Sequence, residues 1–454
     1  MPASRFPPLP QFDVHAVALP SKEVGGDFYD LVTRSDGSFV FAIADVAGKG
    51  VAAVVVSRAK TGRSSNLSPT VAVITVEDTR IALGHLAARY RVELNLDVVA
   101  VGGSNGKTTT KELIAAALRQ KLNILWSEAS FNNDIGVPLT LLKIDSTHSA
   151  AVVEVGTNHP GELAPLLRMI QPRYGVITSI GREHLEFFGD VAGVAREEGT
   201  IAEMLPCDGR LFVNGDCEWS PRIAQRTSAG VVKVGFGAQN DWRAQDVRVG
   251  EDGVSFEVAA PRPECSGEYR IRLLGRHQVP NALLALAVGA ELGVSPALAR
   301  RGLEECPPPK MRLQVWESNG IRVIDDTYNA NADSMLAALQ TLADLPCTGR
   351  RVAVLGDMAE LGEHTAAAHR EVGRRVGELG IHRLVAVGKW AKETAEAARV
   401  VGVKDVREFA DVAGAQAVAK QFATPGDLLL LKASRATGLE RIAEAIMVPA
   451  RRSI

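Results

Sequence analysis

The chain has 454 residues, of which 46% are hydrophobic and 23% are charged, fractions that are typical of a folded globular protein. Its formal net charge of −2 argues against a general nucleic-acid-binding protein, whose phosphate contacts need a basic surface. We expect no membrane span, because no apolar run is long enough, and no signal peptide at the first residues.

The five cysteines are scattered along the chain and never form a CxxC pair. This usage predicts reduced thiols and a cytoplasmic protein. The length predicts about three domains.

Residues 1–60 differ in character from the rest of the chain. Stretches 19–32 and 41–56 flank a glycine-bearing turn at 35–37, a pattern that predicts a β-hairpin. They resemble the start of the metal-dependent serine phosphatase domains of SpoIIE/RsbU-type regulators, which implies that Asp27 and Asp45 are metal-binding carboxylates. The resemblance ends near Ser57, so we expect a short β-rich, phosphatase-like fragment without phosphatase activity.

A polar stretch over 58–69 predicts a linker. The sequence then predicts a strand over 71–78 and a helix over 79–94, with Ile81, Leu83, Leu86 and Ala87 on one side. We assign residues 61–96 to this linker, strand and helix.

The segment from Val98 to Leu118 predicts a buried strand, a glycine-rich turn and an amphipathic helix. The glycines let the backbone approach an anion, and the amides at the start of the helix point toward it. Lys107 supplies a charge for the β- and γ-phosphates of a nucleotide and Thr108 a hydroxyl for Mg²⁺. The candidate ATP-binding residues of this loop are Gly103, Ser104, Asn105, Gly106, Lys107, Thr108 and Thr109.

Short apolar strands alternate with helices over residues 97–307 and again over 308–454, with the proline-rich stretch 306–312 between them. This alternation predicts an α/β fold: a central domain with a phosphate loop and a parallel sheet, followed by a C-terminal Rossmann-like α/β domain. Ligands of such sheets bind at the carboxyl ends of the strands. Glu154 and His184 follow two of the predicted strands.

Six further stretches occur in a fixed order at 130–142, 152–163, 177–189, 273–285, 324–335 and 354–362. With the phosphate loop they resemble the Mur ligases, and the stretches NNDIGVPLTLL and DDTYNAN favour the branch that adds D-alanyl-D-alanine to UDP-N-acetylmuramoyl tripeptide. The resemblance implies an ATP- and Mg²⁺-dependent amide ligase that acts through an acyl phosphate in peptidoglycan synthesis. Its expected partners are these two substrates, and its expected oligomeric state is monomeric.

The resemblance also implies roles for individual residues. Thr108, Glu154, His184 and Glu198 are the implied Mg²⁺ ligands, and the last three are candidate catalytic residues together with Lys107. Glu198 falls where the family has a carbamylated lysine, and we interpret its carboxylate as a substitute for the carbamate. The implied ATP contacts outside the loop are Asn281, Arg312, Asp326, Asn329 and Asn331; the implied substrate contacts are Asn132, Asn133, Ser434 and Arg435.

The sequence departs from the family at Gly102, Gln278 and Ala433, where threonine, asparagine and glycine are usual. It also gives no match to the family's uridine-binding N-terminal domain before Val71, so we interpret residues 61–96 as a remnant of that domain. Two alternatives to an active ligase therefore stay open: a protein that binds ATP without ligating, and a signalling phosphatase coupled to a ligase module.

Overall fold

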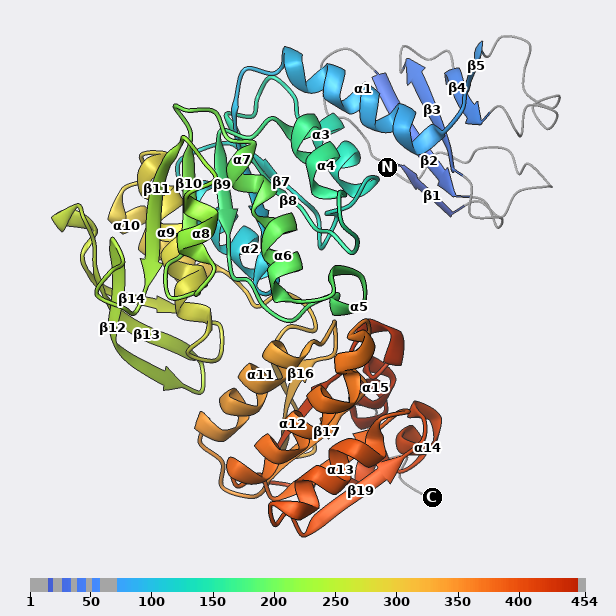
Figure 1. The fold of residues 1–454 in the computed structure, drawn as a ribbon, viewed down its shortest axis with the longest axis vertical. Helices are drawn as coiled ribbons and strands as arrows, with labels where there is room; N and C mark the ends of the chain where they lie inside the picture. The colour runs from blue at the N-terminus through green and yellow to red at the C-terminus, as the bar shows by residue number, and fades with distance from the viewer. Residues whose placement is uncertain (1–14, 19–26, 34–38, 46–50, 58–71, 448–454) are drawn as a thin grey trace.

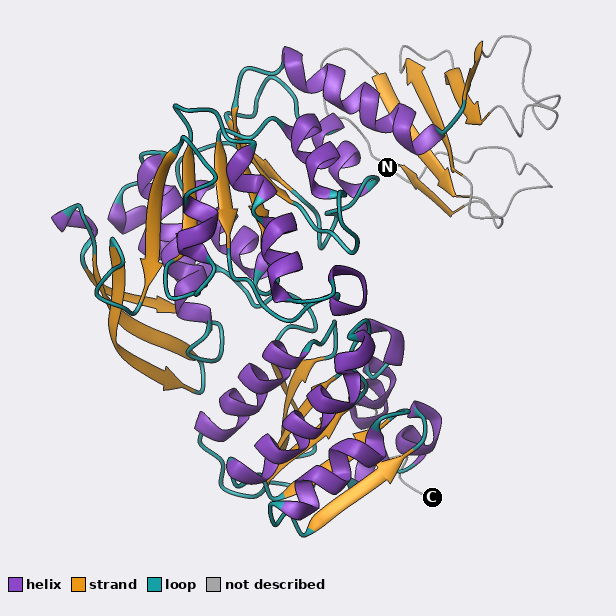
Figure 2. Ribbon diagram, in the orientation of Figure 1, coloured by secondary structure: helices purple, strands orange, loops and turns teal. Residues whose placement is uncertain are grey.

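The computed structural model describes residues 15–18, 27–33, 39–45, 51–57 and 72–447. Within these ranges the chain forms three sheets, which follow one another from the N-terminal to the C-terminal part of the molecule (Figure 1). Figure 2 shows helices against the faces of the second and third sheets. The predicted α/β class with a central and a C-terminal domain is confirmed.

The first sheet has the order β1-β2-β3-β4-β5. The expected hairpin is present, since β2 and β3 pair antiparallel with Asp27 opposite Asp45. The side chains of Asp27 and Asp45 lie outside the described residues. The strands are β1 (His15–Ala18), β2 (Asp27–Thr33), β3 (Phe39–Asp45), β4 (Val51–Ser57) and β5 (Ala72–Val76).

The boundary that we expected at residue 60 falls inside this sheet, because β5 pairs in parallel with β4. The following helix α1 (Thr79–Glu93) is capped by Asp78, whose side chain accepts from the backbone of Arg80 and Ile81. Leu83 of α1 packs with Val55 of β4 in one buried cluster. The strands on both sides of residue 60 therefore belong to one sheet in the described ranges, while Ala87 of α1 also packs in the core that contains residues of α3 and α4.

The helix α1 also corrects our assignment of its buried side. Leu83 and Ala87 are buried as expected, but Ile81 is 59% exposed. Residues 81 and 83 are two apart, which places them on opposite sides of a helix with 3.6 residues per turn.

The central sheet has the order β14-β13-β12-β11-β10-β9-β6-β8-β7, and it is parallel from β12 to β7. The antiparallel edge of β12, β13 and β14 was not predicted. The strands are β6 (Asp97–Gly102), β7 (Ile124–Trp126), β8 (Ala150–Glu154), β9 (Tyr174–Ile177), β10 (Arg210–Asn214), β11 (Gly230–Gly235), β12 (Trp242–Gly250), β13 (Gly253–Ala259) and β14 (Gly267–Ile271).

Alternate residues of β6 enter two different cores, because successive strand side chains point to opposite faces. Val98 and Ala100 pack in one cluster, and Val99 and Val101 pack in the other. The first cluster includes side chains of α3 (Gly136–Leu142), α4 (Leu163–Ile170), α6 (Val191–Glu198), α7 (Thr200–Glu203) and α8 (Ser220–Ala224). The second includes those of α2 (Lys107–Leu118), α9 (Gln278–Glu291) and α10 (Pro296–Glu305).

The C-terminal sheet has the order β15-β16-β20-β17-β18-β19, with β15 antiparallel to β16 and the remaining neighbours parallel. The strands are β15 (Gln314–Ser318), β16 (Ile321–Asp326), β17 (Arg351–Leu355), β18 (Arg383–Val387), β19 (Asp405–Phe409) and β20 (Leu428–Lys432). One face packs on α11 (Ala332–Asp344), α12 (Thr365–Glu378) and α13 (Ala391–Val400), and the other on α14 (Val412–Ala417) and α15 (Glu440–Met447).

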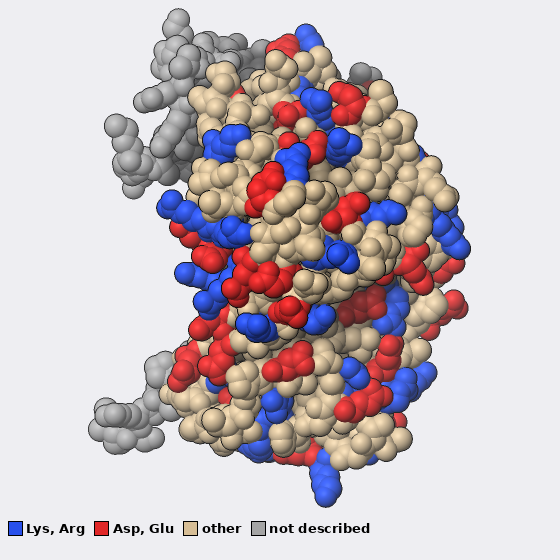
Figure 3. All heavy atoms as spheres, turned by 90° about the vertical axis from the view of Figure 1, so that its left-hand side faces the viewer, with Lys and Arg blue, Asp and Glu red and all other residues tan. Residues whose placement is uncertain are grey.

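The described surface carries both signs of charge. On the face in Figure 3, Lys and Arg side chains are interspersed with Asp and Glu over the central and C-terminal domains, in keeping with the small net charge. Among the described residues, no helix combines the length and the apolar character that crossing a bilayer requires. The five cysteines all lie in described ranges and are unpaired, as expected.

Candidate active site

A cavity of about 700 Å³ lies where the carboxyl ends of the central and C-terminal sheets meet. Most of the candidate residues from the sequence line it together. They are Ser104, Asn105, Gly106, Lys107, Thr108, Thr109, Asn132, Asn133, Glu154, His184, Asn281, Arg312, Asp326, Asn329 and Asn331. Gly103, Glu198, Ser434 and Arg435 are not among the lining residues.

The phosphate loop is held by the segment that follows β9. Ser104 N–H donates to Ser179 O at 2.7 Å, and Thr178 Oγ1 donates to Asn105 O at 2.6 Å. Gly103 has φ +113°, and a Cβ there would come within 2.4 Å of Thr178 Oγ1. Gly106 has φ +88°, and its Cβ would lie 2.7 Å from Asn281 Oδ1. Both positions therefore require glycine, for conformation and for space.

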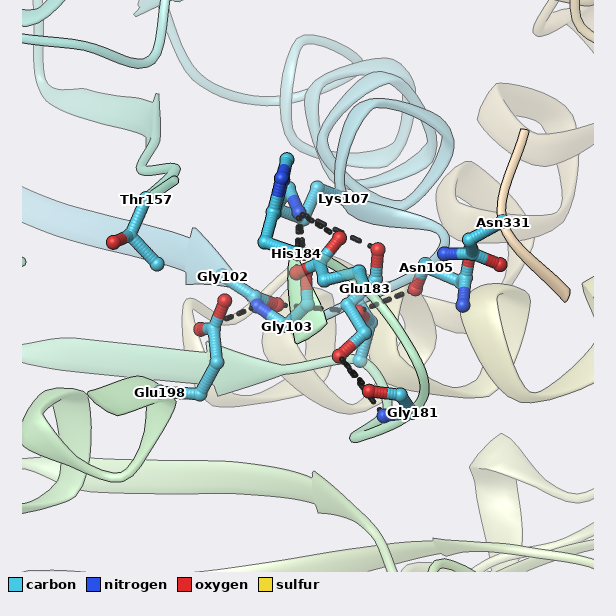
Figure 4. Close-up of polar contacts among 12 residues, drawn as sticks. Gly102, Gly103, Asn105, Lys107, Thr157, Gly181, Glu183, His184, Glu198 and Asn331 are labelled. Atoms are coloured by element: carbon cyan, nitrogen blue, oxygen red, sulfur yellow. Dashed lines mark hydrogen bonds and ion pairs between the residues drawn. The ribbon is translucent and has the colours of Figure 1, made fainter. Parts of the chain in front are cut away.

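Lys107 is folded back over its own loop in this structure (Figure 4). Its Nζ donates to Gly103 O at 2.6 Å and lies 3.4 Å from both carboxylate oxygens of Glu183. Burial disfavours the ammonium charge, but Glu183, Glu198 and Glu154 together outweigh burial and raise the pKa of Lys107. The lysine is thus a cation fixed at the mouth of the loop.

Glu183 was not among the candidates, although it directly precedes His184 in the sequence. Burial is the main cause that raises the pKa of Glu183 to about 8; Glu198 acts in the same direction and Lys107 opposes them. In the sequence, the position of Glu183 directly before the expected metal-binding histidine was the one feature that could have marked it as a site residue.

Glu154 ends β8 inside a buried polar cluster. Its Oε1 accepts from Asn132 Nδ2 at 2.9 Å, and its Oε2 lies 3.6 Å from Lys111 Nζ. That Oε2 has no hydrogen-bond partner among the described residues. Asn132, expected at the substrate, therefore also holds the carboxylate.

Lys111 is the second residue that sequence reasoning missed. Its side chain is fully buried, and its Nζ donates to the carbonyls of Ser127 and Ala129. The i+4 spacing from Lys107 on α2 was available in the sequence, but that spacing alone is equally typical of a solvated helix face.

Glu198 lies at the end of α6, beside Gly102 and Gly103 of the phosphate loop (Figure 4), and does not line the cavity. Its Oε2 accepts the Gly103 N–H at 2.7 Å, and its Oε1 finds no hydrogen-bond partner in the described part of the chain. Burial is the main cause that raises its pKa. A Cβ on residue 102 would lie 2.9 Å from Oε2 and 2.3 Å from Ile201 Cδ1, so glycine at 102 makes room for this carboxylate.

His184 precedes α5 (Leu185–Phe188) and adopts a left-handed backbone with φ 50°. Its Nδ1 lies 2.5 Å from Glu360 Oε2 of the C-terminal domain. Burial is the main cause that lowers the pKa of His184, with Glu360 opposing it. A neutral imidazole can act as a metal ligand through its free nitrogen.

Asn331 and Arg182 also make contacts between the central and C-terminal domains. Asn331 Nδ2 donates to Asn105 Oδ1 at 3.0 Å while its Oδ1 caps α11. Arg182 pairs with Asp333 at 2.6 Å and with Glu371 at 2.5 Å.

The C-terminal side of the cavity is organised by Lys432, which was also missed. Its Nζ lies 2.6 Å from Asp326 Oδ2 and donates to Asn329 O at 2.9 Å. Arg312 stacks on Tyr328, with 4.1 Å from its guanidinium carbon to the ring centroid. Arg435 N–H contacts Asn329 Oδ1 at 3.4 Å, so this candidate lies beside the cavity.

Ser434 and Asn133 have structural partners. Ser434 is 2% exposed, its N–H donates to Asp357 O and its Oγ contacts Thr437 Oγ1. Asn133 Oδ1 accepts from the Gly136 N–H at 2.9 Å at the start of α3.

The donor chemistry of the cavity fits a hard cation that arrives with a nucleotide. Among the described residues, no group of three or more His, Cys, Asp or Glu side chains could hold a metal ion. Mg²⁺, however, is commonly bound by one or two carboxylates together with phosphate oxygens and waters. Thr108, Glu154 and His184 line the same cavity, and Glu154 Oε2 has no hydrogen-bond partner among the described residues.

The charges that line the cavity also indicate that a bound nucleotide would need a cation. Its carboxyl side chains outnumber its ammonium and guanidinium groups; the former are Glu154, Glu162, Glu183, Asp216, Asp326 and Asp333, and the latter Lys107, Arg312 and Lys432. A triphosphate in this cavity would require added positive charge.

Comparison with protein families identifies two matches. Residues 101–289 match the Mur ligase middle domain, and residues 311–435 match the Mur ligase, glutamate ligase domain. The chain is 36% identical to the UDP-N-acetylmuramoyl-tripeptide–D-alanyl-D-alanine ligase of Bacillus subtilis, over 88% of this chain and 85% of that ligase.

The relative of the same name from Mycobacterium tuberculosis is 33% identical over 96% of this chain and 91% of its own length. The 4% of this chain that the alignment leaves out is far fewer than sixty residues. The alignment therefore includes part of residues 1–60, the region that we compared with a phosphatase.

Solved structures agree with these matches. MurF from Acinetobacter baumannii superposes with a TM-score of 0.77 at 33% identity, covering 85% of this chain and 84% of that one. The MurF ligase of Thermotoga maritima in complex with ADP gives a TM-score of 0.73 at 25% identity, covering 83% and 85%.

Proposed function

Because the chain belongs to the Mur ligase family, in its MurF branch, we propose that it is an ATP-dependent ligase that joins D-alanyl-D-alanine to UDP-N-acetylmuramoyl tripeptide. The observation that carries this proposal is the convergence of the phosphate loop, Glu154 and His184 with Arg312, Asp326 and Asn331 on one cavity between two domains. The proposal is also supported by the alignment of this chain with most of the length of relatives that are named for this activity.

The proposed chemistry has two steps. A carboxylate oxygen of the tripeptide attacks the γ-phosphorus of ATP, which forms an acyl phosphate and releases ADP. The amine of D-alanyl-D-alanine then attacks the acyl carbon, the amide bond forms, and phosphate leaves as the amine loses a proton.

The residues would share this work as follows. Gly103 and Ser104 N–H are directed to Glu198 and Ser179, so we assign phosphate binding to the later amides at the start of α2. Lys107 would leave Gly103 O and Glu183 and offset charge on the transferred phosphoryl group. Arg312 and Asn331 would approach the nucleotide from the C-terminal domain.

The residues that would hold Mg²⁺ are Thr108, Glu154 and His184. A bound divalent cation supplies charge neutralisation between the phosphate and the attacking carboxylate. For Glu198 we keep the proposal that it substitutes for the family's carbamate, but since Glu198 does not line the cavity, its carboxylate would act by supporting the loop through the Gly103 N–H.

For the N-terminal unit we propose a role in binding the uridine end of the substrate. The continuity of β1–β5 with α1 and the reach of the Mycobacterium tuberculosis alignment support one domain here. A phosphatase would be favoured instead by manganese-dependent hydrolysis of a phosphoserine peptide that disappears in Asp45→Asn.

The test is ADP release by the full chain with ATP, Mg²⁺, UDP-N-acetylmuramoyl tripeptide and D-alanyl-D-alanine. We expect release that requires both acceptor substrates, and mass spectrometry should detect the pentapeptide product. Calorimetry with the UDP-muramoyl tripeptide separates an active ligase from a protein that binds only ATP. ATP binding without tripeptide binding or product would contradict the proposal.

A further inference from the structure

The turn that carries His184 and the loop that carries Glu360 have matching backbone strain. His184 has φ 50° and Glu360 has φ 60°. Residues other than glycine rarely adopt this left-handed region, and they persist there only where surrounding contacts impose it. Two such residues in contact across a domain interface indicate that their side-chain directions matter.

The contact between them uses both side chains and backbone. His184 Nδ1 is 2.5 Å from Glu360 Oε2, and the Glu186 N–H donates to Glu360 O at 3.0 Å. Gly362 lies so close that an added Cβ would be 3.1 Å from Glu186 Cα. The loop after β17 is therefore fitted to the turn before α5.

The turn that carries His184 contacts the C-terminal domain through a second charged residue, Arg182. Arg182 contacts Asp333 and Glu371, both from the C-terminal domain. Glu360 differs from these carboxylates because its partner is an imidazole that lines the cavity. A docking role alone would not require that partner.

We propose that Glu360 is a positioning residue that orients His184 for a divalent cation, so that the C-terminal domain completes the cation site of the central domain. The inference rests on the proposed function, in which His184 is a cation ligand. An ionised carboxylate only accepts hydrogen bonds, so Nδ1 carries the proton and the lone pair of the neutral ring lies on Nε2. Carboxylate partners of this kind fix the tautomer and the ring orientation of metal-binding histidines.

The experiment uses Mn²⁺ as the probe, titrated into the full chain saturated with ADP, with free Mn²⁺ followed by electron paramagnetic resonance. Glu360→Ala should weaken Mn²⁺ affinity about 10-fold or more. The matched control is Glu371→Ala, which removes another carboxylate that crosses the same interface, with 36% side-chain exposure against 42% for Glu360. It should leave Mn²⁺ affinity within about twofold, as for a partly exposed ion pair.

Two further variants separate positioning from docking. His184→Ala should weaken Mn²⁺ affinity at least as much as Glu360→Ala, and the double variant should lose no more than His184→Ala alone. Metal-free ADP affinity should be unchanged in all of them. Equal weakening by Glu360→Ala and Glu371→Ala would overturn the inference, since Glu360 would then act only as a docking contact.

Unchanged Mn²⁺ affinity in Glu360→Ala would also overturn the inference, whatever His184→Ala does. The proposed ligase activity is judged separately by product formation in the unmodified chain, which does not depend on the ligand set. Failure of the two proposals is therefore distinguishable.

Discussion

The central and C-terminal sheets both carry charged side chains at or near the cavity, and the two sets differ in their hydrogen-bond partners. At the central sheet, Glu154 Oε2 and Glu198 Oε1 find no hydrogen-bond partner among the described residues. At the C-terminal sheet, Lys432 contacts Asp326 and Asn329 O, and Asp357 accepts the N–H groups of Lys389 and Trp390 at 2.9 and 3.0 Å.

Buried acceptors without partners are costly, and native structures keep them mainly where a ligand or ion completes them. In the C-terminal domain, Glu393 Oε2 and Glu440 Oε2 also find no hydrogen-bond partner among the described residues, but these two residues do not line the cavity. At the cavity itself, we therefore expect Glu154 of the central sheet to contact a ligand or ion. At the C-terminal sheet, Lys432 and Asp357 hold the backbone of neighbouring loops. Both are mainly parallel sheets with helices on their faces, although their strand orders differ, so the α/β class alone does not determine how the charges at the strand ends are paired.

The largest expected effect tests the central sheet directly. Lys107→Ala should reduce ADP release by at least about 10²–10³-fold, because it removes a fixed charge at the transferred phosphoryl group. Lys143→Ala, which removes a lysine paired with Glu128 at 2.9 Å outside the cavity, should retain normal turnover. Normal turnover in Lys107→Ala would contradict the assignment of the phosphate loop.

The second test concerns the buried cation behind Glu154. Lys111→Met should lower the free energy of unfolding by about 3–5 kcal/mol, because Glu154 is left buried without its cation. Urea denaturation measures this change. Lys121→Met removes a lysine whose Nζ donates to Gly293 O in an exposed setting and should cost less than about 0.5 kcal/mol. Similar costs for the two variants would mean that the Lys111 pair does not offset burial of Glu154.

The third test examines a closed network of the C-terminal domain. Asp427 accepts hydrogen bonds from Arg350 N, Arg350 Nη2 and Thr424 N, each at 2.8 Å. Asp427→Asn should destabilise the protein by about 1.5–3 kcal/mol in thermal unfolding, since an amide nitrogen would face these donors.

Asp411→Asn is the control for that variant. Asp411 Oδ1 caps α14 through the Gly414 N–H, and asparagine caps helices about equally well. A large loss in this variant, or none in Asp427→Asn, would contradict the description of the network.

The smallest expected effect is a pH dependence from His369. Its Nε2 accepts from the Met358 N–H at 3.1 Å and its Nδ1 contacts Thr365 O at 2.8 Å, which fixes a neutral ring. Burial is the main cause that lowers its pKa below the ordinary value of 6.5. The unfolded chain then binds more protons at this residue just below pH 6.5, so stability should fall as the pH decreases through that value.

Urea denaturation at pH 7.5 and pH 5.5 measures the His369 effect. One proton limits the slope to about 1.4 kcal/mol per pH unit. The difference between the two pH values should shrink in His369→Gln, and an unchanged difference would assign the pH dependence to other groups.

The sequence by itself determined the α/β class and the glycine-rich turn between strand and helix, and most of the candidate residues that it suggested line the cavity. These follow from local signals, since alternating apolar strands and helices fix a parallel sheet and its ligands lie at the strand ends. Glu154 and His184 could be placed because one lies at the end of a strand and the other follows a strand in the chain. The prediction that Ile81 lies on the buried side of α1 was wrong, because the sequence does not show which side of this helix packs against the rest of the protein.

Only the tertiary structure decided which of these residues contact one another. Lys111 meets Glu154, Glu198 meets Gly103, and Glu360 meets His184 across 176 positions of the chain. The tertiary structure also decided that β5 pairs with β4 and that the central sheet has an antiparallel edge. Local propensity carries no information about such partners, because they are selected by the burial and charge compensation of the assembled domains.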